Sequence, residues 1–388
     1  MENVRIGIIG IGNMGSSHVK WIMAGEIEHL VLTAVADIRE ERRTWVRETY
    51  PGVAVFNDAE ALMTSGLVDA VLIATPHYLH PPLAMAALNH GLHVMSEKPA
   101  GVYTKAVREE NELARKSDKT FAIMFNQRTH CMYRKVKEII ASGELGALRR
   151  VNWLITDWFR TQYYYDSGSW RATWDGEGGG VLLNQCPHNL DLLQWMVGMP
   201  VRVRAFTHNG KWHNIEVEDD VTAYMEFENG ATGVFITSTG DAHGTNRFEI
   251  QMDRAKFVVE NNQLTMTEYE MTEQEFSRTN PQPFATVQST ERKVETDGKN
   301  PQHKGVINAW GGAILRGEPL VAGGEEGLNG LTLSNAMHLS AFLGKAVEIP
   351  FDEELYYNEL MKRAATSRRK TGVKERVADT SGSYAGNR

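Results

Sequence analysis

The sequence has little cysteine and no long apolar run. Two cysteines, Cys131 and Cys186, occur in 388 residues, too few for a disulfide framework and wrongly spaced for a metal knuckle. A reducing, cytoplasmic compartment is therefore expected. No apolar run reaches about 18 residues, so no transmembrane helix is expected. The opening stretch MENVRIGIIG also lacks the charged region and apolar core of a secretory signal.

An excess of positive charge is missing as well. The chain is 42% hydrophobic and 23% charged, with a net charge of −8, which is ordinary for a globular protein and argues against nucleic acid as a partner. The end of the chain is the exception, because residues 362–388 hold eight Lys and Arg against two Asp and Glu. An RNA or membrane contact stays open for this tail, but a solvated terminus is favoured.

The first third of the chain alternates short β-rich runs with helical patterns. The runs are VRIGIIG, LVLTAVAD, DAVLIAT, HVMSEKP and TFAIMFN, with patterns such as SSHVKWIMAGEIEHL and PPLAMAALNHG between them. This alternation is typical of βαβ units in a parallel sheet. Residues 1–126 are therefore predicted to form a doubly wound α/β domain of Rossmann type.

From about Gly146 the pattern changes to consecutive strands. LRRVNWLITDWF is extended, VTAYMEFENGATGVFITST turns at an Asn-Gly pair, and RFEIQMDRAKFVVE turns at an Asp-Arg pair. Successive hairpins predict a large, open, mainly antiparallel sheet, with helices at about 305–315 and 327–343. Residues 127–360 are expected to form this α+β domain, with a basic tail over 361–388.

A glycine-rich loop follows the first strand. Gly10-Ile-Gly12-Asn13-Met14-Gly15 reads G-x-G-x-x-G, in which the glycines permit a tight turn, close approach of a pyrophosphate and close helix–strand packing. Asp37 ends the next apolar run, where a carboxylate accepts the ribose hydroxyls of adenosine. That carboxylate repels the 2′-phosphate of NADP, so NAD is the expected cofactor and NADP the less favoured one, although Arg39 offers a phosphate partner.

A second glycine run, GEGGGVLLNQCPHNLD, leads into a buried segment. Asn184, His188 and Asp191 lie four and three residues apart, so on a helix they would share one face. Pro187 lacks a backbone N–H, so the helix either begins or kinks there. Taken alone, the histidine fits a satisfied core residue better than a catalytic one.

Four motifs in order decide between these interpretations. The nucleotide loop, ATPHYLH, MSEKPAG and GGGVLLNQCPHNLD resemble the Gfo/Idh/MocA family of NAD(P)-dependent sugar and cyclitol oxidoreductases, and the resemblance covers Val4 to about Phe351. It implies that Lys98 of the E-K-P motif reaches substrate and nicotinamide and that His188 is the general base. Members commonly pair through the open sheet, so a homo-dimer or homo-tetramer is expected.

One position departs from the family pattern. The usual second motif is similar to G-G-G-x-x-x-D-x-G-x-H-x-x-D, and this sequence has Asn184 at the first Asp and Cys186 at the following Gly, while His188 and Asp191 match. Because an amide is no base, Asn184 is expected to bind a substrate hydroxyl. Proton transfer then falls on His188, whose ordinary pKa of about 6.5 suits the task, while Lys98 stabilises the alkoxide.

Further candidates flank these motifs. By resemblance, the end of the fourth strand lies along the cofactor, and a two-histidine metal site there is a poor alternative because no Cys or carboxylate completes it, so no metal is expected. The aromatic and arginine-rich stretch 157–176 suits sugar rings, although a packed interface is the alternative. The cofactor candidates are Thr75, Pro76, His77, His80, Glu97 and Gln127; the substrate candidates are Arg160, Tyr163, Trp170, Arg171, Asp191 and His303.

Several functions remain open. The first is NAD-dependent oxidation of a secondary ring hydroxyl in a sugar or glycoside, with C3 of a pyranoside slightly favoured over an inositol ring. The second is a redox glycosidase, in which the ring is oxidised transiently and elimination breaks the glycosidic bond. A non-catalytic NAD-binding sensor is disfavoured, because a sensor has little reason to keep both Lys98 and His188.

Overall fold

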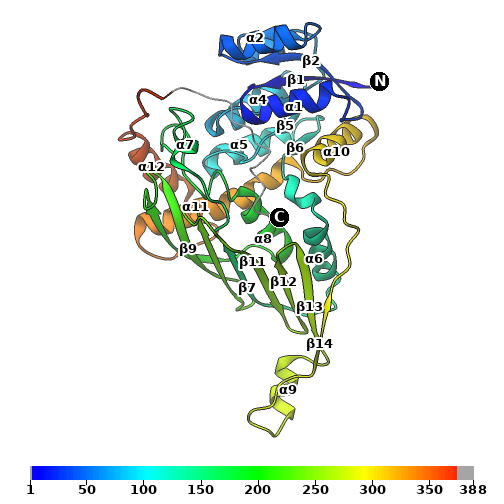
Figure 1. The fold of residues 1–388 in the computed structure, drawn as a ribbon, viewed down its shortest axis with the longest axis vertical. Helices are drawn as coiled ribbons and strands as arrows, with labels where there is room; N and C mark the ends of the chain where they lie inside the picture. Colours follow the sequence, from blue (N-terminus) through cyan, green and yellow to red (C-terminus); the bar gives the residue numbers. More distant parts are fainter. Residues whose placement is uncertain (1, 374–388) are drawn as a thin grey trace.

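The computed structural model describes residues 2–373, and the N-terminal part forms a six-stranded parallel sheet (Figure 1). Its strand order, β3-β2-β1-β4-β5-β6, reverses direction between β1 and β4, as in a doubly wound sheet. This confirms the predicted α/β domain, and only the three-residue β3 has no counterpart in the predicted runs. The strands are β1 (Val4–Ile9), β2 (Leu30–Ala36), β3 (Ala54–Phe56), β4 (Ala70–Ile73), β5 (His93–Ser96) and β6 (Phe121–Ile123).

Helices cover both faces of this sheet. On one face Val19, Ile22 and Trp310 are buried against β1 and β2, and on the other Leu62 and Leu88 are buried against β4. Trp310 belongs to α10, so a segment from the second half of the chain packs on the first sheet. The helices are α1 (Asn13–Met23), α2 (Glu40–Thr49) and α10 (Gln302–Arg316) on the first face, and α3 (Ala59–Met63), α4 (His80–Asn89) and α5 (Thr104–Ala114) on the second.

The second sheet has nine strands in the order β14-β13-β12-β11-β7-β10-β9-β8-β15. Every pairing is antiparallel except that of β7 with β10, and both predicted hairpins, β9–β10 and β11–β12, are confirmed. The strands are β7 (Leu148–Ile155), β8 (Arg202–Asn209), β9 (Glu218–Glu226), β10 (Thr232–Ser238), β11 (Asn246–Met252), β12 (Ala255–Glu260), β13 (Gln263–Tyr269), β14 (Ser289–Lys293) and β15 (Val347–Glu348).

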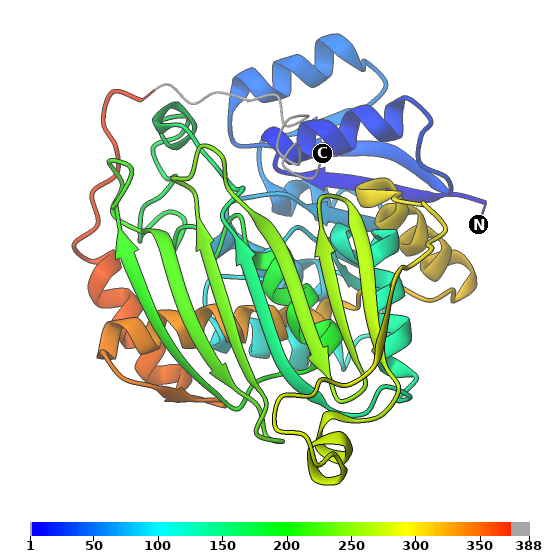
Figure 2. The ribbon, with the colours of Figure 1, turned by 60° about the horizontal axis from the view of Figure 1, so that its bottom comes forward.

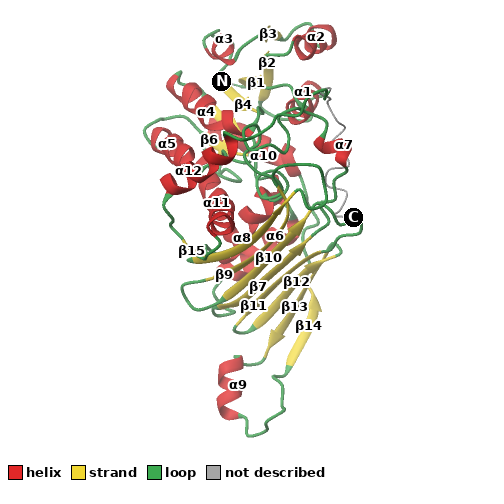
Figure 3. Ribbon diagram, turned by 90° about the vertical axis from the view of Figure 1, so that its left-hand side faces the viewer, coloured by secondary structure: helices red, strands yellow, loops and turns green. Residues whose placement is uncertain are grey.

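One face of this sheet carries the core and the other is bare. Trp153, Phe235 and Phe257 are buried beneath α6 (Cys131–Ala141), α8 (Pro187–Val197) and α11 (Gly327–Leu343), which Figure 3 shows on one side of the strands. Figure 2 shows no helix in front of the opposite face. Shorter elements complete the fold: α7 (Gln162–Tyr165), α9 (Glu273–Thr279), α12 (Glu353–Ala364), η1 (His77–Leu79), η2 (Asn126–Thr129) and η3 (Gly324–Glu326).

The chain after α12 returns to the stretch before the second glycine run. Arg369 Nε lies 2.8 Å from a carboxylate oxygen of Asp175, and Lys370 Nζ donates to the carbonyl oxygen of Tyr165 at 2.7 Å. Most of the predicted basic tail, residues 374–388, lies outside the described part of the chain. Across residues 2–373, no helix is both long enough and apolar enough to cross a bilayer.

Candidate active site

The glycine loop between β1 and α1 has the geometry that a dinucleotide requires. Gly10 has a φ of +90°, and a Cβ placed on Gly15 would lie 1.9 Å from the carbonyl oxygen of Gly10. The first glycine is therefore needed for the turn and the third for helix–strand contact. Gly12 caps α1, which opens with Asn13 and Met14, and nothing lies within 4 Å of a Cβ there. The donor end of α1 is thus open to an anion.

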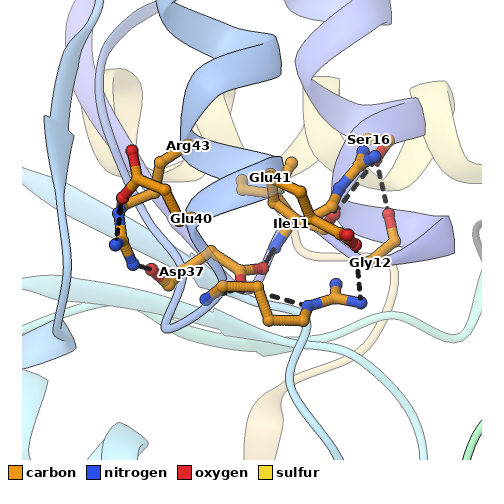
Figure 4. Close-up of polar contacts among 9 residues, drawn as sticks. Ile11, Gly12, Ser16, Asp37, Glu40, Glu41 and Arg43 are labelled. Carbon is orange, nitrogen blue, oxygen red and sulfur yellow. Dashed lines mark hydrogen bonds and ion pairs between the residues drawn. The ribbon is translucent and has the colours of Figure 1, made fainter. Parts of the chain in front are cut away.

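Asp37 lies at the far edge of this loop, nearly buried (Figure 4). One carboxylate oxygen accepts the N–H of Ile11 at 2.7 Å, and the other accepts the N–H of Arg39 at 2.9 Å. The Arg42 guanidinium donates to the carbonyl oxygen of Ile11 at 2.7 Å and to Ser16 Oγ at 2.6 Å. Burial, and then the charge of Arg39, lower the pKa of Arg42. The edge thus offers a carboxylate for ribose hydroxyls and two guanidinium groups for a phosphate.

The loop after β4 is held by a buried histidine. Thr75 and Pro76 lead into η1, and His80 lies between two carbonyl oxygens, that of Thr75 at 2.8 Å and that of Pro99 at 2.7 Å. His80 therefore joins the ends of β4 and β5. Thr75 Oγ1 is buried with no hydrogen-bond partner within residues 2–373, so it is available to a ligand. His77 lies 3.3 Å through Nδ1 from the carbonyl oxygen of Glu177.

Glu97, at the end of β5, faces a histidine of α1. His18 Nε2 lies 2.8 Å from Glu97 Oε1, and both side chains are buried. Burial alone would raise the pKa of Glu97, but the hydrogen bond and charge of His18 outweigh it, so the pKa lies below its ordinary value. The ring of His303 lies 6.1 Å from that of His18, and Gln127 lies beside Gln302. His18 carried no motif signal and was missed in the sequence.

Lys98, just after β5, and His188, on α8, lie close enough for the charge of the lysine to act on the histidine. Lys98 Nζ donates to the main-chain carbonyl oxygen of Asn184 at 2.9 Å. His188 is 2% exposed in the first turn of α8, and burial followed by the charges of Lys98 and His303 holds its pKa well below the ordinary value. A neutral imidazole beside an ammonium group can accept a proton from a hydroxyl while the ammonium stabilises the oxygen that results.

The expectation that Asn184, His188 and Asp191 share a helix face is wrong for Asn184. The helix begins at Pro187, and Asn184 lies in the preceding turns, where its N–H bonds the carbonyl oxygen of Gly180. Asp191 is on the helix, but Arg128 binds both of its carboxylate oxygens, at 2.7 and 2.6 Å. Arg128 was not among the predicted site residues.

The aromatic stretch brings a polar network to Asn184. Tyr164 donates its hydroxyl to Asn184 Oδ1 at 3.2 Å and accepts Arg171 Nη1 at 2.7 Å. The predicted neighbour Tyr163 is instead 62% exposed. The Arg171 guanidinium lies 4.7 Å from the ring of Trp170 and 4.5 Å from that of Tyr164, and the Arg160 guanidinium lies 5.3 Å from the Tyr164 ring.

Glu177 is a residue of this network that the sequence analysis missed. Its carboxylate binds Asn184 Nδ2 and the N–H of Ala172, the latter at 2.6 Å, with Arg171 Nη1 at 3.4 Å. Glu177 is part of the GEGGG run that the sequence analysis considered, but only the folded turns bring it to Asn184. Within residues 2–373, no group of three or more His, Cys, Asp or Glu side chains could hold a metal ion.

A cavity of about 190 Å³ lies near the end of β7 and the start of β11. Burial raises the pKa of Asp157, which lines it, to about 6. None of the predicted site residues lines this cavity; its other walls include His130, Tyr133, Asn246, Glu260 and Asn262.

Comparisons with known proteins agree with this geometry. Residues 4–125 match an oxidoreductase family with an NAD-binding Rossmann fold, and residues 133–258 match the GFO/IDH/MocA C-terminal domain. The chain is 25% identical over 264 residues to myo-inositol 2-dehydrogenase of Thermotoga maritima, covering 66% of this chain and 75% of that one. It is 27% identical over 253 residues to D-glucoside 3-dehydrogenase of Escherichia coli, covering 58% and 68%.

Among solved structures, the fold is similar to that of the WlbA dehydrogenase from Bordetella pertussis in complex with NADH and UDP-GlcNAcA. The TM-score is 0.74 at 25% identity, over 90% of this chain and 100% of that chain. With some curated relatives the chain shares a shorter part, 59% of the length of one and 55% of another.

Proposed function

Since the chain belongs to the GFO/IDH/MocA oxidoreductase family, we propose that it oxidises a secondary ring hydroxyl of a sugar or glycoside with NAD as hydride acceptor. The observation that carries the proposal is that Lys98, just after β5, lies close enough to the buried His188 for its charge to help lower the pKa of that histidine. These two side chains supply what alcohol oxidation needs, a proton acceptor and a cation beside the forming alkoxide.

In the proposed mechanism His188 accepts the proton of the reacting hydroxyl. The carbonyl oxygen of Asn184 orients Lys98. Lys98 then donates a hydrogen bond to the oxygen of the reacting hydroxyl and stabilises the negative charge that forms on it. The bound dinucleotide supplies the hydride acceptor, and the protein supplies position and electrostatics. The ring is held between Lys98 and the aromatic stretch, where Trp170, Arg160 and Arg171 offer a face and donors.

The nucleotide edge supports NAD over NADP. The Asp37 carboxylate would repel a 2′-phosphate, and it keeps its place through the N–H groups of Ile11 and Arg39. Arg39 and Arg42 reduce the preference for NAD over NADP, because each guanidinium group could pair with the 2′-phosphate. The residues of the loop, Thr75 and the turn held by His80 fit the rest of a dinucleotide.

For the substrate we favour a pyranoside oxidised at C3 over an inositol ring. Two relatives are named for these two substrate classes, one as a D-glucoside 3-dehydrogenase and one as a myo-inositol 2-dehydrogenase. The aromatic and arginine-rich stretch, with Trp170 and Tyr164 beside Arg171, gives more stacking surface than a bare cyclitol needs. We also propose that the protein acts in the cytoplasm as a homo-oligomer joined through the bare face of the second sheet.

The test is to mix the protein with NAD and follow NADH absorbance with alkyl and aryl glucosides, free hexoses and inositols. Steady NADH formation with one ring class is expected, and it would name the substrate class. Released aglycone without NADH would identify the redox glycosidase instead. No change in either signal, with NADH binding intact, would contradict both enzymatic functions.

A further inference from the structure

Glu177 is a buried carboxylate beside the reacting groups that the mechanism above does not use. Its side chain is 2% exposed, and it directly precedes the three glycines that lead to Asn184. The groups that reach its oxygens are all donors: the N–H of Ala172, the amide of Asn184 and the guanidinium of Arg171. A set of donors fits an ionised carboxylate, which can only accept hydrogen bonds.

Asn184 links this carboxylate to Lys98. Its Nδ2 donates to Glu177, and its Oδ1 accepts from Tyr164 at 3.2 Å and from Gln185 at 3.1 Å. The carboxamide is therefore fixed in one orientation. Its main-chain carbonyl oxygen meanwhile accepts Lys98 Nζ. A single residue thus connects the buried carboxylate with the lysine that the proposed reaction needs.

We propose that Glu177 is a positioning residue of the dehydrogenase, which aims Lys98 through Asn184 and supplies its counter-charge on the substrate side. The inference rests on the proposed function. Glu97 is the other carboxylate near Lys98, but it is engaged by His18 on the α1 side. Glu177 is therefore the carboxylate that balances Arg171 of the aromatic stretch together with Lys98.

The charges around Lys98 give the expected direction. Burial lowers the pKa of Lys98, Glu97 and Glu177 raise it, and Arg160 and Arg171 lower it again. Loss of the Glu177 charge should lower the pKa of Lys98 further, so that the ammonium form is lost at a lower pH. The histidines that also feel the charge of Lys98 are His77, His80, His188 and His303.

The contact between positions 177 and 184 permits a reciprocal exchange. The pair now holds one negative charge, on Glu177, whereas the family pattern has Asp at 184. Two carboxylates in contact would repel one another and share a proton. A Gln at 177 facing an Asp at 184 would keep one charge and one hydrogen bond, with the donor and acceptor exchanged.

The experiment compares Glu177→Gln, Asn184→Asp and the double variant. We expect each single variant to lower kcat by about 100-fold, the cost of a misplaced catalytic group. In Glu177→Gln the alkaline limb of the pH profile should also move to lower pH. The double variant should recover most of kcat and return the limb towards its original pH, which a merely structural role for Glu177 would not produce. The matched control is Glu110→Gln, a buried glutamate on α5, which should change neither quantity.

A second readout does not depend on turnover. Amine-reactive labelling of Lys98, located by peptide mass spectrometry across pH, should show a lower midpoint in Glu177→Gln than in the parent protein, with NADH affinity and melting temperature recorded for each. An unchanged kcat profile and an unchanged labelling midpoint in Glu177→Gln would overturn the inference, as would a double variant no better than the worse single one. A parent protein that binds NADH but oxidises no ring hydroxyl would instead overturn the proposed function, and the labelling would still decide the link to Lys98.

Discussion

At the scale of single residues, His188 decides how the proposed reaction responds to pH. Its pKa lies well below the ordinary value because the ring is buried beside the charge of Lys98. A group with a lowered pKa stays neutral, and so able to accept a proton, until the pH falls through that lowered value. We therefore expect kcat/KM to stay level between pH 8 and 6, with no acid limb near 6.5.

His188→Gln should lower kcat by about 100-fold or more, since a positioned general base contributes that much. Steady-state rates across pH, together with NADH binding as a control for folding, would check both statements. An acid limb centred at 6.5 or above would show that the imidazole titrates as if it were exposed.

Asp37 gives a residue-scale prediction about the cofactor. Asp37→Asn keeps an acceptor for the N–H of Ile11 but removes the charge that repels a 2′-phosphate. The ratio of kcat/KM for NADP to that for NAD should rise by about 10- to 100-fold, as expected for a charged hydrogen-bonding group. Adding Arg39→Ala should reverse most of the gain, because the phosphate then loses a cation. A ratio that Asp37→Asn leaves unchanged would mean that the pocket shape sets the choice.

Glu110 on α5 gives a prediction about stability. Both carboxylate oxygens are buried without a hydrogen-bond partner within residues 2–373, and burial raises the pKa to about 8. The unfolded chain releases this proton near pH 4.5, so stability is full below that pH and falls until the folded pKa is reached. The loss is roughly 3 to 5 kcal/mol at pH 8 and above.

Glu110→Gln removes that loss while still burying a neutral polar group. We expect its melting temperature to exceed that of the parent by about 4 °C at pH 8.5 and to match it at pH 5. Differential scanning calorimetry at the two pH values measures this. An equal shift at both would assign the effect to packing and not to ionisation.

At the scale of elements, periodic patterns were enough to predict most of the fold. The apolar runs that became β1, β2, β4 and β5 and the hairpins at Asn229 and Asp253 are local signals that survive folding. β3 has three half-buried residues, too few for any period to show. In the candidate site, motifs singled out Lys98 and His188, whose roles stay a prediction.

What the sequence did not reveal depends on turns that bring distant groups together. Glu177 meets Asn184 only because the glycine run folds back, and His18 meets Glu97 only because α1 crosses the end of β5. No spacing rule encodes such contacts. Tyr163 was the tyrosine named as a candidate in the sequence, but in the one-turn helix α7 it is the neighbouring Tyr164 that reaches Asn184.

The segment after α12 gives a prediction at this scale. Arg369 binds Asp175, and Lys370 binds Asp166 and the carbonyl oxygen of Tyr165. These contacts hold the aromatic stretch in place. Exposed ion pairs contribute less than about 1 kcal/mol each. We expect the double replacement of Arg369 and Lys370 by Ala to raise KM for the sugar by about threefold, with NADH affinity unchanged.

Steady-state kinetics and NADH titration would test the role of this segment, with Lys362→Ala as the control, because the ion pair of Lys362 among the described residues is with Glu359 on the same helix, α12. A fall in kcat with an unchanged KM would contradict a role in holding the substrate side of the site.

At the scale of the whole molecule, the bare face of the second sheet carries an apolar row. Strand register places Leu154 beside Ile236, Ile236 beside Thr222, and Thr222 beside Phe206, across β7, β10, β9 and β8. Phe206 is 54% exposed and Leu154 is 36% exposed. Large apolar side chains on three of these four strands, β7, β10 and β8, fit the homo-oligomer proposed above, since a second copy offers the same row by two-fold symmetry.

Phe206→Glu places a charge at the β8 end of that row, on a side chain that the proposed pairing would bury. The dimer dissociation constant should rise by about 30-fold or more, the effect of losing a strongly contributing contact residue. Sedimentation or light scattering over a concentration series measures it. Phe284→Glu is the control, because Phe284 is 96% exposed in the segment between α9 and β14 and off the row, and it should leave the assembly unchanged. A parent protein that is monomeric at all concentrations would contradict the proposed pairing, and equal effects of the two variants would place the contact elsewhere.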